Sequence, residues 1–181
     1  MEYTDQELLD QFRNEETRHV AFNLLVKKYQ QRLYWHIRKI VIDHDDSNDI
    51  IQNVFIKVWK SLETFRADAQ LYTWLYRIAT NESISFLNQK KKRFFLPLTD
   101  VEHELASQLQ EDPHFTGDRI QLKLQQAILK LPTQQRIVFN MKYYDEMKYE
   151  EISQILEVSV GALKASYHHA VKKIEKILTR D

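Results

Sequence analysis

The sequence contains no cysteine, which excludes disulfide bonds and metal sites built on thiolates. Its 181 residues include two glycines and three prolines, so a glycine-rich phosphate-binding loop is also excluded. The formal net charge is zero, which argues against a protein that coats nucleic acid through charge alone. No apolar run approaches the roughly 18 residues that a membrane span needs. The acidic, amphipathic N-terminus does not have the form of a signal peptide, and we therefore expect a soluble, cytoplasmic protein.

Charge and helix-breaking residues divide the chain into three parts. Residues 94–118 carry six acidic and no basic side chains, and they hold Pro97, Pro113 and Gly117. This composition predicts a flexible acidic linker, with a short helix around Glu102–Gln110. The flanking segments, 1–93 and 119–181, are compatible with helix almost throughout and show no alternating strand pattern. The sequence therefore predicts an all-α fold of two helical domains joined by the linker.

Residues 148–173 have the pattern of two short helices separated by a tight turn. Ser159 is a good N-cap for the second helix, because its hydroxyl can accept a hydrogen bond from a free backbone N–H. Apolar residues recur at intervals of three and four on one face of each helix. The outward stripe of the second helix consists of Gly161, Lys164, Ala165, His168 and Lys172. A helix–turn–helix of this kind can lay its second helix in a major groove, but the same pattern fits a helical hairpin inside a bundle.

The N-terminal segment predicts four helices. A capping box at Thr4–Glu7 begins the first, which should bury Leu8, Leu9 and Phe12. The second should cover residues 17–42, and the third residues 47–63, with N-cap oxygens supplied by residues 44–47. The fourth, from about residue 73 to 93, combines aromatic side chains with a basic end. Aromatic rings beside cations are suited to bind single-stranded DNA. However, Trp74 and Phe86 could also belong to the core, and four cations at the end of a helix complement its dipole without any ligand.

Three segments in this order resemble the extracytoplasmic-function group of bacterial sigma factors. They are DIIQNVFIKVWKSLETF at 49–65, TWLYRIATNESISFLNQKKKR at 73–93, and the segment from Leu131 to Lys173 that contains the helix–turn–helix. The resemblance covers nearly the whole chain apart from the linker. It implies a non-enzymatic factor that binds core RNA polymerase, at the beta-prime clamp and the beta flap, and directs it to promoter DNA.

The resemblance also implies roles for individual residues of the first domain. The outward face of the helix after Asp49 should dock on the clamp through Asp49, Gln52, Asn53, Ile56 and Trp59. The family usually has an acid where this chain has Asn53, and Trp59 could equally close the core of its own domain. The loop at 65–72 and the following helix should hold the melted, single-stranded minus-ten element. The residues implied there are Arg77, Asn81, Lys90, Lys91, Lys92 and Arg93.

The helix–turn–helix should read the double-stranded minus-thirty-five element. The residues implied there are Ser159, Gly161, Lys164, Ala165, His168, Lys172 and Lys173. The chain departs from the usual pattern at Lys148 in place of a capping Ser or Thr, and at Glu157 in place of the turn glycine. It departs again at Ala162 and at Ala165-Ser166, where an arginine that could contact phosphate or guanine is missing.

Two other functions compete with the one that this resemblance implies. A one-component regulator with a ligand-binding or dimerising helical domain would explain residues 148–173, but it would not explain the two upstream segments. An enzyme or a metal protein is disfavoured because the seven histidines are scattered and His168-His169 point to different sides of a helix. We therefore expect no cofactor and no metal. The family is commonly held inactive by an anti-sigma factor, which makes such a factor an expected partner.

Overall fold

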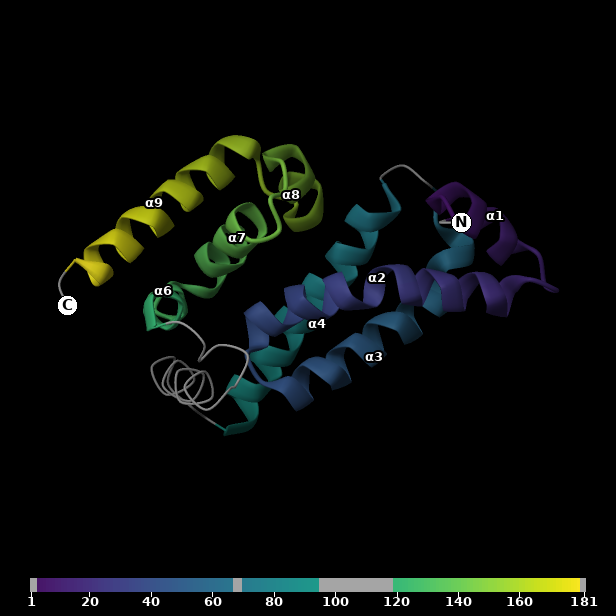
Figure 1. Cartoon of the computed structure of the whole chain (residues 1–181), viewed down its shortest axis with the longest axis horizontal. Coiled ribbons are helices and arrows are strands. Elements are labelled where there is room, and N and C mark those ends of the chain that lie inside the picture. The colour runs from purple at the N-terminus through teal and green to yellow at the C-terminus, as the bar shows by residue number, and fades with distance from the viewer. Residues whose placement is uncertain (1–2, 67–69, 95–118, 180–181) are drawn as a thin grey trace.

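A computed structural model describes residues 3–66, 70–94 and 119–179 (Figure 1). These ranges contain helices and connecting turns and no β-strand. The elements are α1 (Asp5–Arg13), α2 (Arg18–Val41), α3 (His44–Ser61), the 3-10 turn η1 (Leu62–Thr64), α4 (Leu71–Phe94), α6 (Arg119–Leu129), α7 (Thr133–Tyr143), α8 (Tyr149–Leu156) and α9 (Val160–Leu178). Within these ranges, no helix is both long and apolar enough to cross a bilayer. The predicted all-α class is confirmed.

The N-terminal unit, α1 to α4, is built around α2. The apolar stripe of α2 buries Leu25, Leu33 and Ile37, and α1, α3 and α4 pack against this helix. The predicted capping box of α1 is confirmed, since the Thr4 hydroxyl accepts from the Glu7 N–H while the Glu7 carboxylate accepts from the Thr4 N–H. The capping box fixes where α1 begins, and the apolar face of this helix contributes Leu8, Leu9 and Phe12 to the core.

Helix α3 begins three residues earlier than the sequence predicts. Its N-cap is Asp43, whose carboxylate accepts a hydrogen bond from the Asp46 N–H at 2.8 Å. The preceding residue, Ile42, has a φ of 66°, which ends α2 abruptly. A branched side chain seldom adopts this conformation, and the position is therefore difficult to anticipate from sequence. The acids at 45 and 46 lie in the first turn of α3, where they complement the helix dipole.

The C-terminal unit, α6 to α9, packs α7 and α6 against the long α9. Ala127, Leu131, Phe139, Ala170 and Ile174 are among the residues of its own small core. The predicted helix–turn–helix is present as α8 and α9, joined by residues 157–159. The predicted short helix at 102–110 lies outside the described residues.

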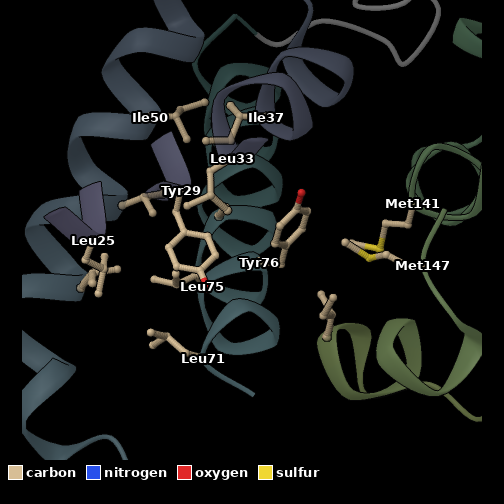
Figure 2. Close-up of a cluster of buried hydrophobic side chains, with 14 of the residues drawn as sticks. Leu25, Tyr29, Leu33, Ile37, Ile50, Leu71, Leu75, Tyr76, Met141 and Met147 are labelled. Atoms are coloured by element: carbon tan, nitrogen blue, oxygen red, sulfur yellow. The ribbon is translucent and has the colours of Figure 1, made fainter. Parts of the chain in front are cut away.

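The two units share a second, larger core. Ile137, Val138, Met141 and Met147 of the C-terminal unit belong to the same buried cluster as the residues of α2 and α4. Figure 2 shows the Tyr76 ring on the side of α4 that faces Met141 and Met147. Helix α7 packs on α2, and α8 packs on α4. The helix–turn–helix is therefore docked on the N-terminal unit by buried apolar side chains.

Candidate nucleic-acid and protein interfaces

The turn of the helix–turn–helix is closed by Glu157 and Ser159. Glu157 has a φ of 57°, and its N–H donates to the carbonyl of Ser153, which ends α8. A left-handed conformation at a residue with a Cβ costs about 1–2 kcal/mol, the strain that the usual turn glycine avoids. The Ser159 hydroxyl accepts from the Ala162 N–H at 3.3 Å, which confirms the predicted N-cap of α9. At α8, Lys148 cannot accept a hydrogen bond through its side chain, and the remaining half of the capping box is its N–H donating to Glu151.

The outward stripe predicted for the second helix is exposed along α9. Gly161, Lys164, Ala165, His168 and Lys172 all face solvent. A Cβ added to Gly161 would meet no atom within 4 Å, so packing within the chain does not explain this glycine. Leu163, Ala170 and Ile174 on the opposite face are buried. The stripe is therefore a surface available to a ligand, and its cations suit phosphate.

The structure adds Tyr149 and Lys142 to the candidate nucleic-acid surface. The Lys164 ammonium lies 5.7 Å from the centroid of the Tyr149 ring, and the Lys142 ammonium lies 5.1 Å from it. The ring orients both cations beside the start of α8. Sequence reasoning missed this arrangement because residues 142, 149 and 164 belong to three different helices. Lys173, in contrast, donates to the Gln135 side chain of α7 at 3.2 Å.

A second candidate surface is an apolar groove of about 1000 Å³ between α2 and α3. Its α3 side includes Gln52, Ile56 and Trp59, three of the five residues predicted for polymerase docking. Asp49 and Asn53, the other two, are exposed on the same helix. The rest of the lining was not predicted and consists of Phe22, Val26, Lys27, Gln30, Gln31, Tyr34, Asn48, Ile51 and Phe55.

Ile56 and Trp59 differ in how firmly they belong to the chain's own core. The Ile56 side chain is 52% exposed, the kind of apolar surface that binding would bury. The Trp59 ring is half-buried and packs edge-on against Phe12 and Phe22, with centroid separations of 5.3 and 4.9 Å. His19 stacks on the same ring at 5.0 Å. Trp59 thus supports the groove as well as lining it.

A third candidate surface is a hollow of about 760 Å³ bounded by the end of α3, the start of α4 and Gln154 of α8. The Phe65 and Trp74 rings lie in its wall with their centroids 5.0 Å apart. Lys60 and Arg66 bring cations to it, and so does Lys57, whose ammonium pairs with the Glu82 carboxylate. A partly exposed ring beside cations is suited to stack an unpaired base while the cations meet its phosphates.

The predicted minus-ten residues occupy different environments. Arg77 lines the hollow, and Asn81 is exposed one turn further along α4. The Lys90 ammonium lies 3.3 Å from the Asp46 carboxylate. Burial raises the pKa of Asp46, although the nearby Lys90 acts to lower it. Lys92 is exposed. The side chains of Lys91 and Arg93 lie outside the described part of the structure.

Comparison with known proteins gives matches over both units. Residues 25–93 match the family described as Sigma-70 region 2, and residues 121–174 match Sigma-70, region 4. The chain is 30% identical to RNA polymerase sigma-H factor of Pseudomonas aeruginosa, over 96% of this chain and 93% of that protein. It is 32% identical to the ECF RNA polymerase sigma factor SigW of Bacillus subtilis, over 87% and 89%. It is 30% identical to the ECF RNA polymerase sigma-E factor of Escherichia coli, over 95% and 93%.

Two solved structures show the same fold. One is CnrH in complex with the cytosolic domain of CnrY, with a TM-score of 0.71 and 24% identity over 98% of each chain. The other is the sigma factor RpoE of Bartonella quintana in complex with the anti-sigma factor NepR, with a TM-score of 0.69 and 18% identity. That match covers 88% of this chain and 98% of the other. At these identities the two structures support the arrangement of helices.

Proposed function

The chain belongs to the extracytoplasmic-function group of sigma-70 RNA polymerase sigma factors, and from this membership we propose which of its surfaces binds polymerase and which bind promoter DNA. As a sigma factor it binds core RNA polymerase and directs it to specific promoters. Residues 1–93 form the domain that docks on polymerase and opens the minus-ten element. Residues 119–181 form the domain that reads the minus-thirty-five element, and residues 94–118 link the two.

The docking surface in this proposal is the groove between α2 and α3. Asp49, Gln52, Asn53, Ile56 and Trp59 present its α3 side to the beta-prime clamp. Half-exposed Ile56 is the anchor, since a large apolar side chain in the wall of a groove contributes most when binding removes it from water. The exposed polar side chains of Gln52 and Asn53 form the rim, where they fix orientation more than affinity.

The minus-ten surface is the hollow beside Trp74. A base flipped from the melted strand stacks on this ring, while Lys57, Lys60 and Arg77 meet the backbone. Extruding a base costs a few kcal/mol, which a shaped site must offset with contacts to the single strand. Asn81, Lys90, Lys91, Lys92 and Arg93 extend this surface along α4, so that the single strand follows the helix toward its basic end.

The minus-thirty-five surface is the exposed stripe of α9. Gly161 allows close approach of the backbone, and the N-terminus of α9 behind Ser159 attracts phosphate. Lys164, Ala165 and His168 face the groove, while Lys172 and Lys173 meet phosphates. The missing arginine at position 166 removes a direct base contact, and docking on polymerase, including the beta flap, raises the effective concentration enough for modest contacts to suffice.

Relatives with this fold also indicate partners. The solved structures that it resembles hold CnrY and the anti-sigma factor NepR, and an anti-sigma factor is accordingly a proposed partner of this chain. The chain carries out no chemistry of its own and acts in the cytoplasm, where its polymerase is located.

The observation that carries the function is the pair of family matches, at 25–93 and 121–174, in the order that a sigma factor requires. A one-component regulator would leave the first match unexplained. The experiment is size-exclusion chromatography of the chain with and without purified bacterial core polymerase. We expect a monomer alone and a one-to-one complex with core. A stable dimer that leaves core polymerase unbound would instead indicate the regulator, because such proteins read two half-sites.

A further inference from the structure

The hollow beside Trp74 is built by both units of the chain. Gln154 of α8 lines it together with side chains from the end of α3 and the start of α4. The Arg77 guanidinium joins α4 to α8 at this place, because it donates to the Gln154 carbonyl and lies 3.4 Å from the Glu157 carboxylate. The hollow has a volume of about 760 Å³. Sites for small molecules have volumes of about 300–1,000 Å³ and often lie where two units meet.

The wall of the hollow offers a face on which one planar ring can stack. The Trp74 indole is half-buried, and its centroid lies 5.0 Å from that of the Phe65 ring. Phe65 is buried and holds the indole in place, while Ile78 adds apolar surface beside it. A nucleobase of any kind can use such a ring, because every base has a flat π-face.

The charges around the hollow match a phosphate monoester. Among the described residues four cations line it, and two of them, Lys57 and Arg77, are paired with glutamates. The other two, Lys60 and Arg66, are exposed and have no carboxylate partner within the described ranges. A phosphate monoester carries a charge of about −1.5 to −2 at pH 7, whereas a phosphate inside a DNA strand carries a single charge. Two unpaired cations therefore complement the monoester more fully.

Two hydroxyl groups that line the hollow have lone pairs to offer. The Ser61 hydroxyl donates to the Lys57 carbonyl at 2.6 Å, and the Thr64 hydroxyl donates to the Ser61 carbonyl at 2.9 Å. Since each proton is already committed, each oxygen is left as an acceptor for a ligand that brings its own donors. A ribonucleotide brings such donors, including the 2′-hydroxyl that DNA lacks.

We propose that the hollow is a binding site for a free ribonucleoside 5′-monophosphate, whose base stacks on Trp74 while its phosphate lies between Lys60 and Arg66. The ribose hydroxyls donate to Ser61 and Thr64. The site itself does not depend on the function proposed above, but its effect does, because the nucleotide and the melted minus-ten strand compete for the same hollow. Promoter opening by this chain therefore falls as the nucleotide concentration rises.

The test is isothermal titration calorimetry of the full chain, without polymerase or DNA, with adenosine 5′-monophosphate and guanosine 5′-monophosphate. Adenosine, ribose 5-phosphate and inorganic phosphate are titrated in parallel, because each makes only part of the proposed contacts. We expect each nucleotide to bind about tenfold or more tightly than any of these fragments, since stacking and the phosphate contacts act together. Nucleotide affinity equal to that of ribose 5-phosphate would overturn the proposal, because charge alone would then explain binding.

The 2′-deoxy form of each nucleotide tests the ribose contacts. Loss of one hydrogen bond to an acceptor in the hollow should weaken binding about threefold. Equal affinity for the two forms would contradict the assignment of Ser61 and Thr64 to the ribose.

Lys60→Gln is expected to lower affinity for adenosine 5′-monophosphate about fivefold and to leave affinity for adenosine unchanged, because it removes a phosphate contact and no ring. Lys60 is exposed, so the fold should survive the change. Lys130→Gln is the matched control, since Lys130 is an exposed lysine between α6 and α7 that does not line the hollow. If the two variants bind the nucleotide equally well, the hollow is not the site.

A competition experiment separates this proposal from the proposed function. A fluorescently labelled single strand is bound to the free chain, and adenosine 5′-monophosphate is then added. We expect the nucleotide to weaken strand binding at the concentrations at which it binds in calorimetry. A strand that stays equally well bound at saturating nucleotide would overturn the competition. Absence of nucleotide binding in calorimetry would overturn the site and leave the proposed function standing, whereas failure of the chain to bind core polymerase would refute that function.

Discussion

Ile56→Asp is expected to weaken binding of the chain to core polymerase about 30-fold or more, while the free energy of unfolding changes by less than about 0.5 kcal/mol. The Ile56 side chain is 52% exposed in the groove between α2 and α3, so the folded chain loses little when it is replaced. A carboxylate within a desolvated interface is costly, because it has no partner there. Binding is measured by fluorescence anisotropy with labelled core polymerase, and unfolding with urea.

Val20→Asp is the matched control for this substitution. Val20 is an apolar residue of α2 that is 59% exposed and does not line the groove. The control should bind polymerase like the unsubstituted chain. Trp59→Ala, in contrast, should lower both binding and stability, because that ring also packs on Phe12 and Phe22. If Ile56→Asp and Val20→Asp bind equally well, the groove is not the docking surface.

Trp74→Ala is expected to reduce open-complex formation on a duplex promoter about ten- to hundredfold, because stacking of one base contributes about 1–3 kcal/mol. The ring lies in the wall of the hollow beside Phe65, where a flipped base would stack on it. Strand opening is measured by permanganate reactivity of unpaired thymines. Binding of the same variant to core polymerase should be unchanged, since the docking groove is on the other side of α3.

Trp74→Phe separates stacking from packing. Phenylalanine keeps an aromatic face, and this variant should recover most of the open complex. Thermal unfolding of both variants shows how much of the loss comes from the contact with Phe65. Open-complex formation by Trp74→Ala at the rate of the unsubstituted chain would remove Trp74 from the minus-ten site.

Helix positions and their buried faces followed from local patterns. The capping box at Thr4 and the N-cap at Ser159 depend on residues within three positions of each other, and both are confirmed. The predicted start of α3 was wrong, because four neighbouring polar residues could each have capped that helix. The choice of Asp43 depends on the positive φ at Ile42, a conformation that residue type does not predict.

The surfaces between helices were predictable only in part. The α3 side of the groove follows from periodicity, but its α2 side depends on how the two helices cross. The Asp145 carboxylate contacts His36 and Lys39 of α2. These residues lie more than 100 positions earlier in the chain, and no local pattern relates them to Asp145. The contact of Asn140 was unpredictable for the same reason. Its side-chain amide donates to the carbonyl of Lys39 on another helix, and the sequence around Asn140 does not indicate that partner.

Run-off transcription of sheared genomic DNA by purified core polymerase, with and without the chain, tests the central claim most directly. The account predicts new RNA 5′ ends that require the chain, preceded by two shared sequence elements, and loss of these ends with Ile56→Asp. Start sites identical with and without the chain would contradict it.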